Sequence, residues 1–352
     1  MGLVTTTIGA YPKPKYFPIP DWFRKEGGPD TPHPTEGYVE VLRAMGDRAE
    51  ALFRRGTREA VLDQVNAGID VPTDGEIRRE NYIHYQCRHL EGIDFRRLSE
   101  KPVRGGTYVA ELPTITGPIR PRDHFLPHDW RVAQGFTERP VKITVPGPMT
   151  IADTLVDAFY DDERRLGADL AEALNAEVRA LAEAGCRWIQ VDEPVFARRP
   201  ETALAFGFEH LERCFHGVPA TVTRVVHMCC GYPAALDMED YPKADPRAYF
   251  ALADAVDAAS VDAVSIEDAH RPNDLTLLGR FRKTTVILGV VAIAKRRVEP
   301  IEEIRARLDD ALAHIEPERL IAAPDCGLGL LGRELALKKL NNLATAAHDL
   351  SV

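Results

Sequence analysis

One histidine, two cysteines and one glutamate have the types and the positions of a metal site. His227 and Cys229 stand two residues apart at the end of an expected strand, so their side chains leave the same face. Glu267 closes a second expected strand, and Cys326 follows a third. All four side chains therefore stand near the C-terminal ends of strands, where they could converge on one ion.

This ligand set suits Zn²⁺, which binds imidazole nitrogen, thiolate sulfur and carboxylate oxygen in tetrahedral geometry. The spacing favours a catalytic ion over a structural one, because 267 − 229 leaves 38 residues and 326 − 267 leaves 59. Two thiolates and one carboxylate give the site a net charge of about −1. A substrate thiol that replaces the carboxylate would bind as an electron-rich thiolate, which is what attack on a methyl group requires. A single histidine or cysteine at a strand end is more often a core residue, and we interpret Cys230 in that way.

The rest of the chain predicts a parallel strand-helix fold. From about residue 140 onward, apolar runs of strand length alternate with segments of helical period. Strands are expected at 141–145, 188–191, 222–226, 263–266, 286–290 and 320–322, with a helix at 166–184 that Gly185 ends. Segments near 5–8 and 68–71 bring the strand count to the eight of a barrel.

We therefore predict an α/β chain that forms one (β/α)8 TIM-type barrel over residues 1–352, with its active site at the C-terminal rim of the strands. Residues of about 77–140 are rich in Arg, Pro and Gly, and we expect them to be an insertion after an early strand. Tyr82, Tyr85 and Trp130 are candidate lid aromatics in it, although ordinary packing also explains them. An open doubly wound sheet is the alternative fold, but no Gly-x-Gly-x-x-Gly follows any expected strand.

The composition of the chain narrows the range of possible binding partners. The chain has 352 residues, 45% of them hydrophobic, and a formal net charge of −10, which argues against a nucleic-acid partner. Its six cysteines lack the regular spacing of a disulfide framework. No secretory signal and no run of about 20 apolar residues stands in the sequence, so we expect a cytoplasmic protein with no membrane role.

Several motifs together resemble a known family over nearly the whole chain. They are Ile8-Gly9-Ala10-Tyr11-Pro12, Asp74-Gly75-Glu76, Val191-Asp192-Glu193-Pro194, His227-Met228-Cys229, Ser265-Ile266-Glu267 and Pro324-Asp325-Cys326-Gly327. In order and spacing they resemble the zinc-binding, C-terminal catalytic half of cobalamin-independent methionine synthase, in a short, single-barrel form. The resemblance implies an enzyme that moves a methyl group to the thiol of homocysteine and so forms methionine.

The resemblance also assigns a substrate site. It implies that Glu76 and Asp192 hold the homocysteine ammonium, and that the backbone from Ile8 and Gly9 to Ala10 receives the carboxylate. Asp192 would share the catalytic role with the exchanging carboxylate of Glu267. Physical chemistry agrees, because two carboxylates that face a thiolate-rich zinc need a cation between them. As the alternative, Asp192 and Glu193 cap the following helix or pair with an arginine.

Three departures from the family pattern bear on the methyl donor. Ala292 and Ala294 stand where the folate-using family has a proton relay, and Thr154 stands where it has a stacking tryptophan. The family's folate-binding N-terminal half also has no counterpart in this sequence. A corrinoid needs no general acid, since its cobalt leaves as a stable anion. We therefore expect methylcobalamin or a methyl-corrinoid protein as donor, and a corrinoid protein as a possible partner.

Other functions fit parts of the pattern. A folate-dependent methionine synthase would use the same thiol site. A zinc alkyltransferase acting on coenzyme M would use the same ligands, but its substrate has a sulfonate and no ammonium for Glu76 and Asp192. A non-catalytic protein that binds zinc and thiols would show the ligand set without turnover.

Overall fold

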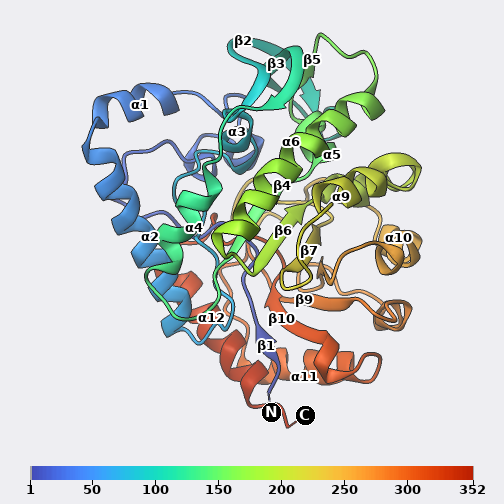
Figure 1. The fold of residues 1–352 in the computed structure, drawn as a ribbon. Coiled ribbons are helices and arrows are strands. Elements are labelled where there is room, and N and C mark those ends of the chain that lie inside the picture. The colour runs from blue at the N-terminus through green and yellow to red at the C-terminus, as the bar shows by residue number, and fades with distance from the viewer. Residues whose placement is uncertain (1, 352) are drawn as a thin grey trace.

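The computed structural model describes residues 2–351 and has a curled parallel sheet at its centre (Figure 1). The strand order is β1-β10-β9-β8-β7-β6-β4. The strands are β1 (Val4–Thr5), β4 (Lys142–Pro146), β6 (Trp188–Asp192), β7 (Thr223–Met228), β8 (Ala263–Glu267), β9 (Thr285–Val291) and β10 (Leu320–Pro324). Isolated parallel bridges join Thr6 to Val71 and Thr73 to Lys142, so residues 71–73 connect β1 with β4. The arrangement is consistent with the predicted TIM-type barrel.

The sequence prediction placed these strands closely. Each of the six strands expected after residue 140 is present within two residues of its predicted ends. The expected strand near 68–71 makes only the two bridges of residues 71–73, and the one near 5–8 is reduced to the two residues of β1. The predicted helix begins three residues earlier than expected, at Glu163, because the carboxylate of Asp162 accepts the Arg165 amide and caps it. It ends as predicted before Gly185, whose φ of 112° suits glycine.

Helices cover the outside of the sheet. They are α1 (Tyr38–Met45), α2 (Arg48–Asn66), α3 (Tyr82–Cys87), α4 (Leu126–Gln134), α5 (Pro148–Asp153), α6 (Glu163–Ala184), α7 (Pro194–Arg198), α8 (Pro200–Thr202), α9 (Phe208–Cys214), α10 (Arg247–Ala258), α11 (Ile301–Leu312) and α12 (Arg333–His348). Short 3-10 or π turns are η1 (Trp22–Arg24), η2 (Gly28–Asp30), η3 (Arg104–Gly106), η4 (Ala203–Gly207), η5 (Leu275–Arg280) and η6 (Pro317–Arg319). Between residues 2 and 351, no helix combines the length and the apolar character that crossing a bilayer requires.

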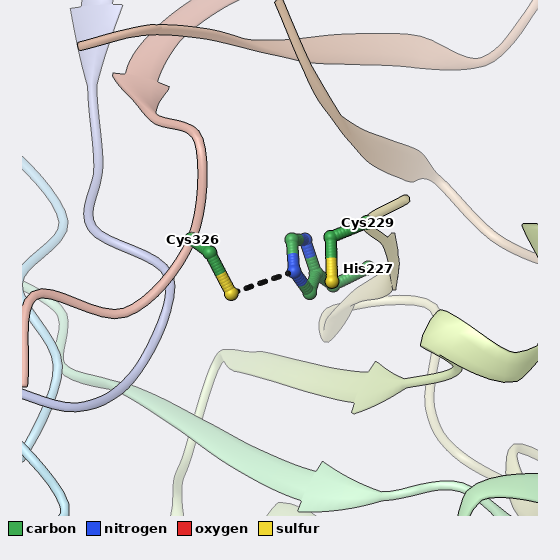
Figure 2. Close-up of side chains that lie close together, drawn as sticks. All are labelled: His227, Cys229 and Cys326. Atoms are coloured by element: carbon green, nitrogen blue, oxygen red, sulfur yellow. Dashed lines mark hydrogen bonds between the residues drawn. The ribbon is translucent and has the colours of Figure 1, made fainter. Parts of the chain in front are cut away.

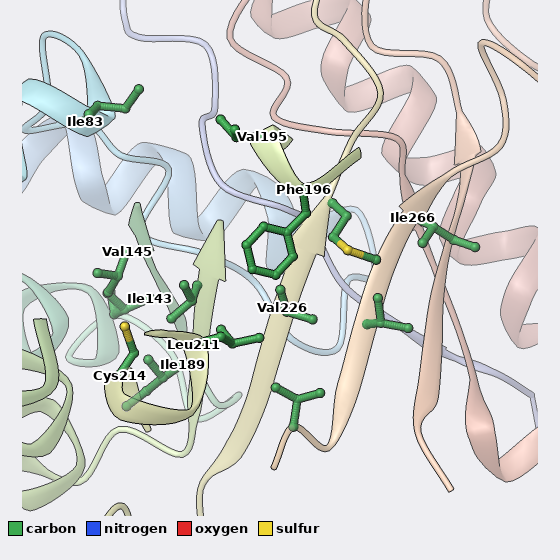
Figure 3. Packing of buried hydrophobic residues seen from close by; sticks show 14 of the residues in the cluster. Ile83, Ile143, Val145, Ile189, Val195, Phe196, Leu211, Cys214, Val226 and Ile266 are labelled. Carbon is green, nitrogen blue, oxygen red and sulfur yellow. The ribbon is translucent and has the colours of Figure 1, made fainter. Parts of the chain in front are cut away.

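The hydrophobic core has two main parts at the central sheet, and a third, small cluster consists of Val103, Ala110 and Leu112. The larger part fills the space between the strands and the helices, where Ile189, Val226 and Ile266 of the sheet lie near Phe196 and Leu211 (Figure 3). A smaller cluster comprises Ile8, Val225, Ala263, Ile287, Ile321 and Ala323. Because successive side chains of a strand point to opposite faces, β7, β8, β9 and β10 each contribute to both parts.

A second, three-stranded sheet lies apart from the central one, at the top of Figure 1 and away from the chain ends. It consists of the antiparallel hairpin β2 (Leu90–Val103) and β3 (Tyr108–Pro121), with β5 (Val156–Asp157) parallel to β3. The hairpin lies inside the stretch 77–140 that we expected to be an insertion. The same stretch holds α3 and α4, which pack on β4 and α6, so its description as one insertion stays a prediction.

Lys142 provides a test of how the sheet tolerates charge. Its side chain is fully buried, and its Nζ has no hydrogen-bond partner among the described residues. Burial lowers the pKa of Lys142 to about 7. Between pH 7 and about 10.5 the unfolded state binds a proton that the folded state lacks. The contribution of Lys142 to the free energy of unfolding therefore increases as pH rises through this range. We expect Lys142→Met to raise the free energy of unfolding at pH 7 by about 1–4 kcal/mol, with a smaller gain at pH 10.

Lys339 is the matched control for this measurement. It is equally buried, but its Nζ lies 2.7 Å from the Glu299 carboxylate. Lys339→Met leaves that carboxylate unpaired and should cost about 3–5 kcal/mol in chemical denaturation. Equal losses of stability in the two variants would contradict the difference in pairing.

Candidate metal centre and active site

Three of the four predicted metal ligands come together at the C-terminal end of the sheet. The ligating atoms of His227, Cys229 and Cys326 all lie within 4.8 Å of one another. Figure 2 shows the Cys326 thiol and the His227 ring facing each other, with Sγ 3.4 Å from Nε2. The other ring nitrogen, Nδ1, lies 2.9 Å from Oγ of Ser265. With Nδ1 as the donor to Ser265, Nε2 keeps its lone pair for an ion.

The two cysteines share one polar environment. A hydrogen bond with the Cys326 thiol, together with the neighbouring His227, holds the pKa of Cys229 well below its usual value. The same hydrogen bond, together with burial, raises the pKa of Cys326, so Cys229 is the candidate ligand that more readily becomes the thiolate, which is the form that binds metals. Cys230, the next residue, is a core thiol as predicted, and burial raises its pKa to about 12.

Glu267 is buried nearby but does not belong to the group of three. Its Oε2 accepts the Cys230 amide at 3.0 Å, and its Oε1 has no hydrogen-bond partner within residues 2–351. Burial, followed by Asp325 and Cys229, raises the pKa of this carboxyl to about 8. Arg271 Nη2 lies 3.7 Å from Oε1 without a hydrogen bond to it. One imidazole, two thiols and a carboxylate oxygen that lacks a hydrogen bond form a donor set that fits Zn²⁺.

The predicted substrate residues line the same cavity as the three clustered ligands. This cavity has a volume of about 690 Å³, within the usual range for small-molecule sites. Its walls include Ile8, Gly9, Ala10, Glu76, Asp192, His227, Cys229 and Cys326. The structure therefore brings the two carboxylates predicted to bind the substrate and three candidate metal ligands around one space.

Asp192 lies at the end of β6 and is held by a neighbour on its own strand. Gln190 donates through Nε2 to Asp192 Oδ1 at 2.7 Å and to the Ile8 carbonyl at 2.8 Å. Burial raises the pKa of Asp192 to about 7, and the residue has no ion-pair partner in the described part of the chain. Sequence reasoning missed Gln190, although its position two residues before Asp192 puts both side chains on one face.

Glu76 occupies an unusual backbone conformation, with φ at 54°. Its Oε1 accepts the Thr144 hydroxyl at 2.7 Å, and Arg79 Nη1 lies 3.5 Å away. A Cβ atom on Gly9 would lie 2.6 Å from that same oxygen, so a glycine is required for Glu76 to approach the loop. Arg79 partly neutralises Glu76, whereas Asp192 forms no ion pair within residues 2–351 and is affected only at longer range by His227 and Lys142.

The alternative role of helix capping, which we considered for Asp192 and Glu193, applies in part to Glu193. It caps a helix, but the helix is α5 and not the following α7: its carboxylate accepts the amides of Met149 and Thr150 and the Thr150 hydroxyl. Burial raises the pKa of Glu193 to about 8. Asp192, in contrast, faces the cavity and caps no helix.

Only one of the three residues that suggested a particular methyl donor lines the cavity. Thr154 lines the cavity, but Ala292 and Ala294 are buried outside its wall. Of the candidate lid aromatics, Tyr82 lines the cavity, whereas Tyr85 donates a hydrogen bond to Asp129 away from it. Trp130 is also outside the cavity wall, and it lies against Gly185.

Comparisons with known proteins agree with this geometry. Residues 29–349 match the family described as "Cobalamin-independent synthase, Catalytic domain". Methionine synthase of Saccharolobus solfataricus is 32% identical over 96% of this chain and 92% of its own length, and that of Sulfolobus acidocaldarius is 30% identical over 97% and 90%. The structure of a B12-independent methionine synthase from Shewanella sp. W3-18-1, in complex with selenomethionine, has a TM-score of 0.86 and 27% identity, covering 99% of this chain and 97% of that one. The chain belongs to the cobalamin-independent methionine synthase family.

Cobalt titration tests the metal centre without any assumption about the reaction. Co²⁺ should bind with strong thiolate-to-metal absorption, and Cys326→Ser should weaken its affinity at least tenfold and reduce that absorption. Cys230→Ser is the matched control, because Cys230 is an adjacent buried cysteine outside the group of three. An unchanged spectrum in Cys326→Ser would exclude Cys326 as a ligand.

Proposed function

We propose that this protein is a zinc-dependent enzyme that transfers a methyl group to the thiol of homocysteine and so forms methionine. The single observation that carries the proposal is the shared cavity, in which Asp192 and Glu76 face the group of His227, Cys229 and Cys326. The relatives named methionine synthase support it. So does the similar structure from Shewanella, whose bound selenomethionine is an analogue of the product.

We further propose that the whole chain is one catalytic domain. Within it, the residues of about 77–140 cover the mouth of the barrel. In support, Val103, Arg104, Tyr108 and Leu112 of the β2–β3 hairpin line the same cavity as the site residues.

His227, Cys229, Glu267 and Cys326 would hold the zinc ion in this proposal. A bound zinc ion would keep the substrate sulfur as a thiolate at neutral pH. Cys229 and Cys326 supply negative charge, and Ser265 fixes the ring of His227. Glu267 is the ligand suited to exchange with the substrate, because one of its oxygens has no hydrogen bond within the described residues.

The remaining residues orient the amino acid. Asp192 and Glu76 receive the ammonium, and the backbone from Ile8 to Ala10 receives the carboxylate. Gln190 fixes the distance between these two subsites, because it binds both Asp192 and the Ile8 carbonyl. The substrate sulfur then attacks the methyl carbon, a carbon–sulfur bond forms, and the donor leaves with the electron pair of the bond that breaks.

The comparisons do not support the methyl-corrinoid donor that the sequence suggested, because the matching family is described as cobalamin-independent. The structure also removes part of that argument. Ala292 and Ala294 are outside the cavity wall, so their small size says little about which donor enters. The family description favours a donor other than a corrinoid.

Among the alternatives, an alkyltransferase acting on coenzyme M is disfavoured by Asp192. A buried carboxylate without an ion-pair partner in the described chain suits a ligand with an ammonium group, which coenzyme M lacks. A non-catalytic zinc protein is addressed by measuring turnover.

The direct test is an anaerobic assay of the zinc-loaded protein with homocysteine and either methyltetrahydrofolate or methylcobalamin, with methionine measured by mass spectrometry. We expect methionine from methyltetrahydrofolate and not from methylcobalamin, inhibition by excess homocysteine analogues that keep the ammonium, and no inhibition by coenzyme M. Asp192→Asn should raise the KM for homocysteine by about tenfold or more, since it removes a buried charge partner.

Turnover with coenzyme M and not with homocysteine would move the assignment to the alkyltransferase. Tight thiol binding with no methylated product from any donor would favour the non-catalytic protein.

A further inference from the structure

The tip of the β2–β3 hairpin reaches across the cavity to the loop that follows β7. Arg104, Gly105 and Gly106 form this tip, with φ values of 49°, 69° and 88°. Arg104 Nη1 lies 2.5 Å from the Asp30 carboxylate and donates to the Tyr232 carbonyl at 2.7 Å. The left-handed conformation of Arg104 costs about 1–2 kcal/mol, which its contacts with Asp30 and Tyr232 help to offset.

The side chain of Tyr232 forms a second hydrogen bond, in addition to the one that its backbone carbonyl accepts. Its hydroxyl donates to the carbonyl of Gly327 at 2.7 Å, one residue after Cys326. On the far side of this loop, the Leu328 amide donates to the Ala10 carbonyl at 2.6 Å. The Cys326 loop is therefore fixed between Tyr232 and the Ala10 segment.

We propose that Tyr232 is a positioning residue that links closure of the β2–β3 hairpin over the cavity to the placement of Cys326. Its backbone carbonyl holds the hairpin through Arg104, and its side chain holds the Cys326 loop through Gly327. A change at either end therefore reaches the other through one side chain and one peptide group. The link rests on the proposed function only where it makes Cys326 a zinc ligand.

The link between hairpin closure and ion binding acts in both directions. When Cys326 is fixed by an ion, Tyr232 is fixed with it, and Arg104 keeps its acceptor. The closed hairpin must then strengthen ion binding by the same factor by which the ion stabilises the closed hairpin. The hairpin would thus close over a loaded site and open more readily over an empty one.

Amide hydrogen exchange of the full chain tests the link, first without metal. Arg104→Gln should speed exchange of the Leu328 amide by about fivefold or more, although Arg104 touches nothing in that loop. Tyr232→Phe removes only the hydroxyl and should speed exchange at the hairpin tip, where the Thr107 amide reports. The double variant should be no faster at either place than the more affected single variant.

Tyr108→Phe is the matched control. Its hydroxyl donates to the Pro29 carbonyl at 3.4 Å, so it anchors the same hairpin without contacting the Cys326 loop. It should leave Leu328 exchange unchanged as long as exchange at the hairpin tip, and with it the Arg104–Tyr232 contact, is unchanged. If Arg104→Gln affects only the hairpin and Tyr232→Phe only the Cys326 loop, the proposal is overturned.

Zinc titration of the same proteins separates this proposal from the proposed function. We expect bound zinc to slow amide exchange at the hairpin of the unaltered protein. Arg104→Gln and Tyr232→Phe should each lower zinc affinity by the same factor as this slowing. Bound zinc with no change at the hairpin overturns the link and leaves the metal site intact. A chain that binds no zinc overturns the metal site, while the metal-free exchange data still decide the link.

Discussion

The register between neighbouring parallel strands is the constraint on which the site depends. Asp192 of β6 is paired with His227 of β7, and Glu267 of β8 is paired with Gly289 of β9. Gly289 is in turn paired with Ala323 of β10, three residues before Cys326. Because all of these strands run in one direction, groups far apart in sequence reach one rim together. A shift of one residue in any pair would turn a ligand from the cavity into the helical layer.

The loops that follow the strands also position the site, and Asp325 holds two of these loops together. Its carboxylate accepts the amides of Asp268, Ala269 and His270, together with Nδ1 of His270. The loop after Glu267 is thereby attached to the residue that precedes Cys326. A Cβ atom on Gly289 would lie 2.4 Å from the Asp325 carboxylate, so the small residue in β9 makes the attachment possible.

The sequence could predict what depends on local pattern. Strand periodicity predicted six central strands, and the two-residue spacing of His227 and Cys229 predicted both candidate ligands on one face. Contacts between segments far apart in sequence could not be read in this way. Thr144 meets Glu76 across 68 positions, and Arg104 meets Tyr232 across 128. A strand was expected near residues 68–71, but its short bridges at residues 71–73 lie at the end of that segment. So short a segment carries too little periodicity to fix its limits.

Zinc K-edge X-ray absorption tests the central claim, that these loops hold a metal ion to which the substrate thiol binds in place of a carboxylate. The zinc-loaded protein should show two sulfur ligands when alone and three after homocysteine is added, with one fewer light ligand. In Asp192→Asn the same change should need more homocysteine. If the sulfur count stays at two while homocysteine is bound, the thiol does not reach the metal and the account of the site is wrong.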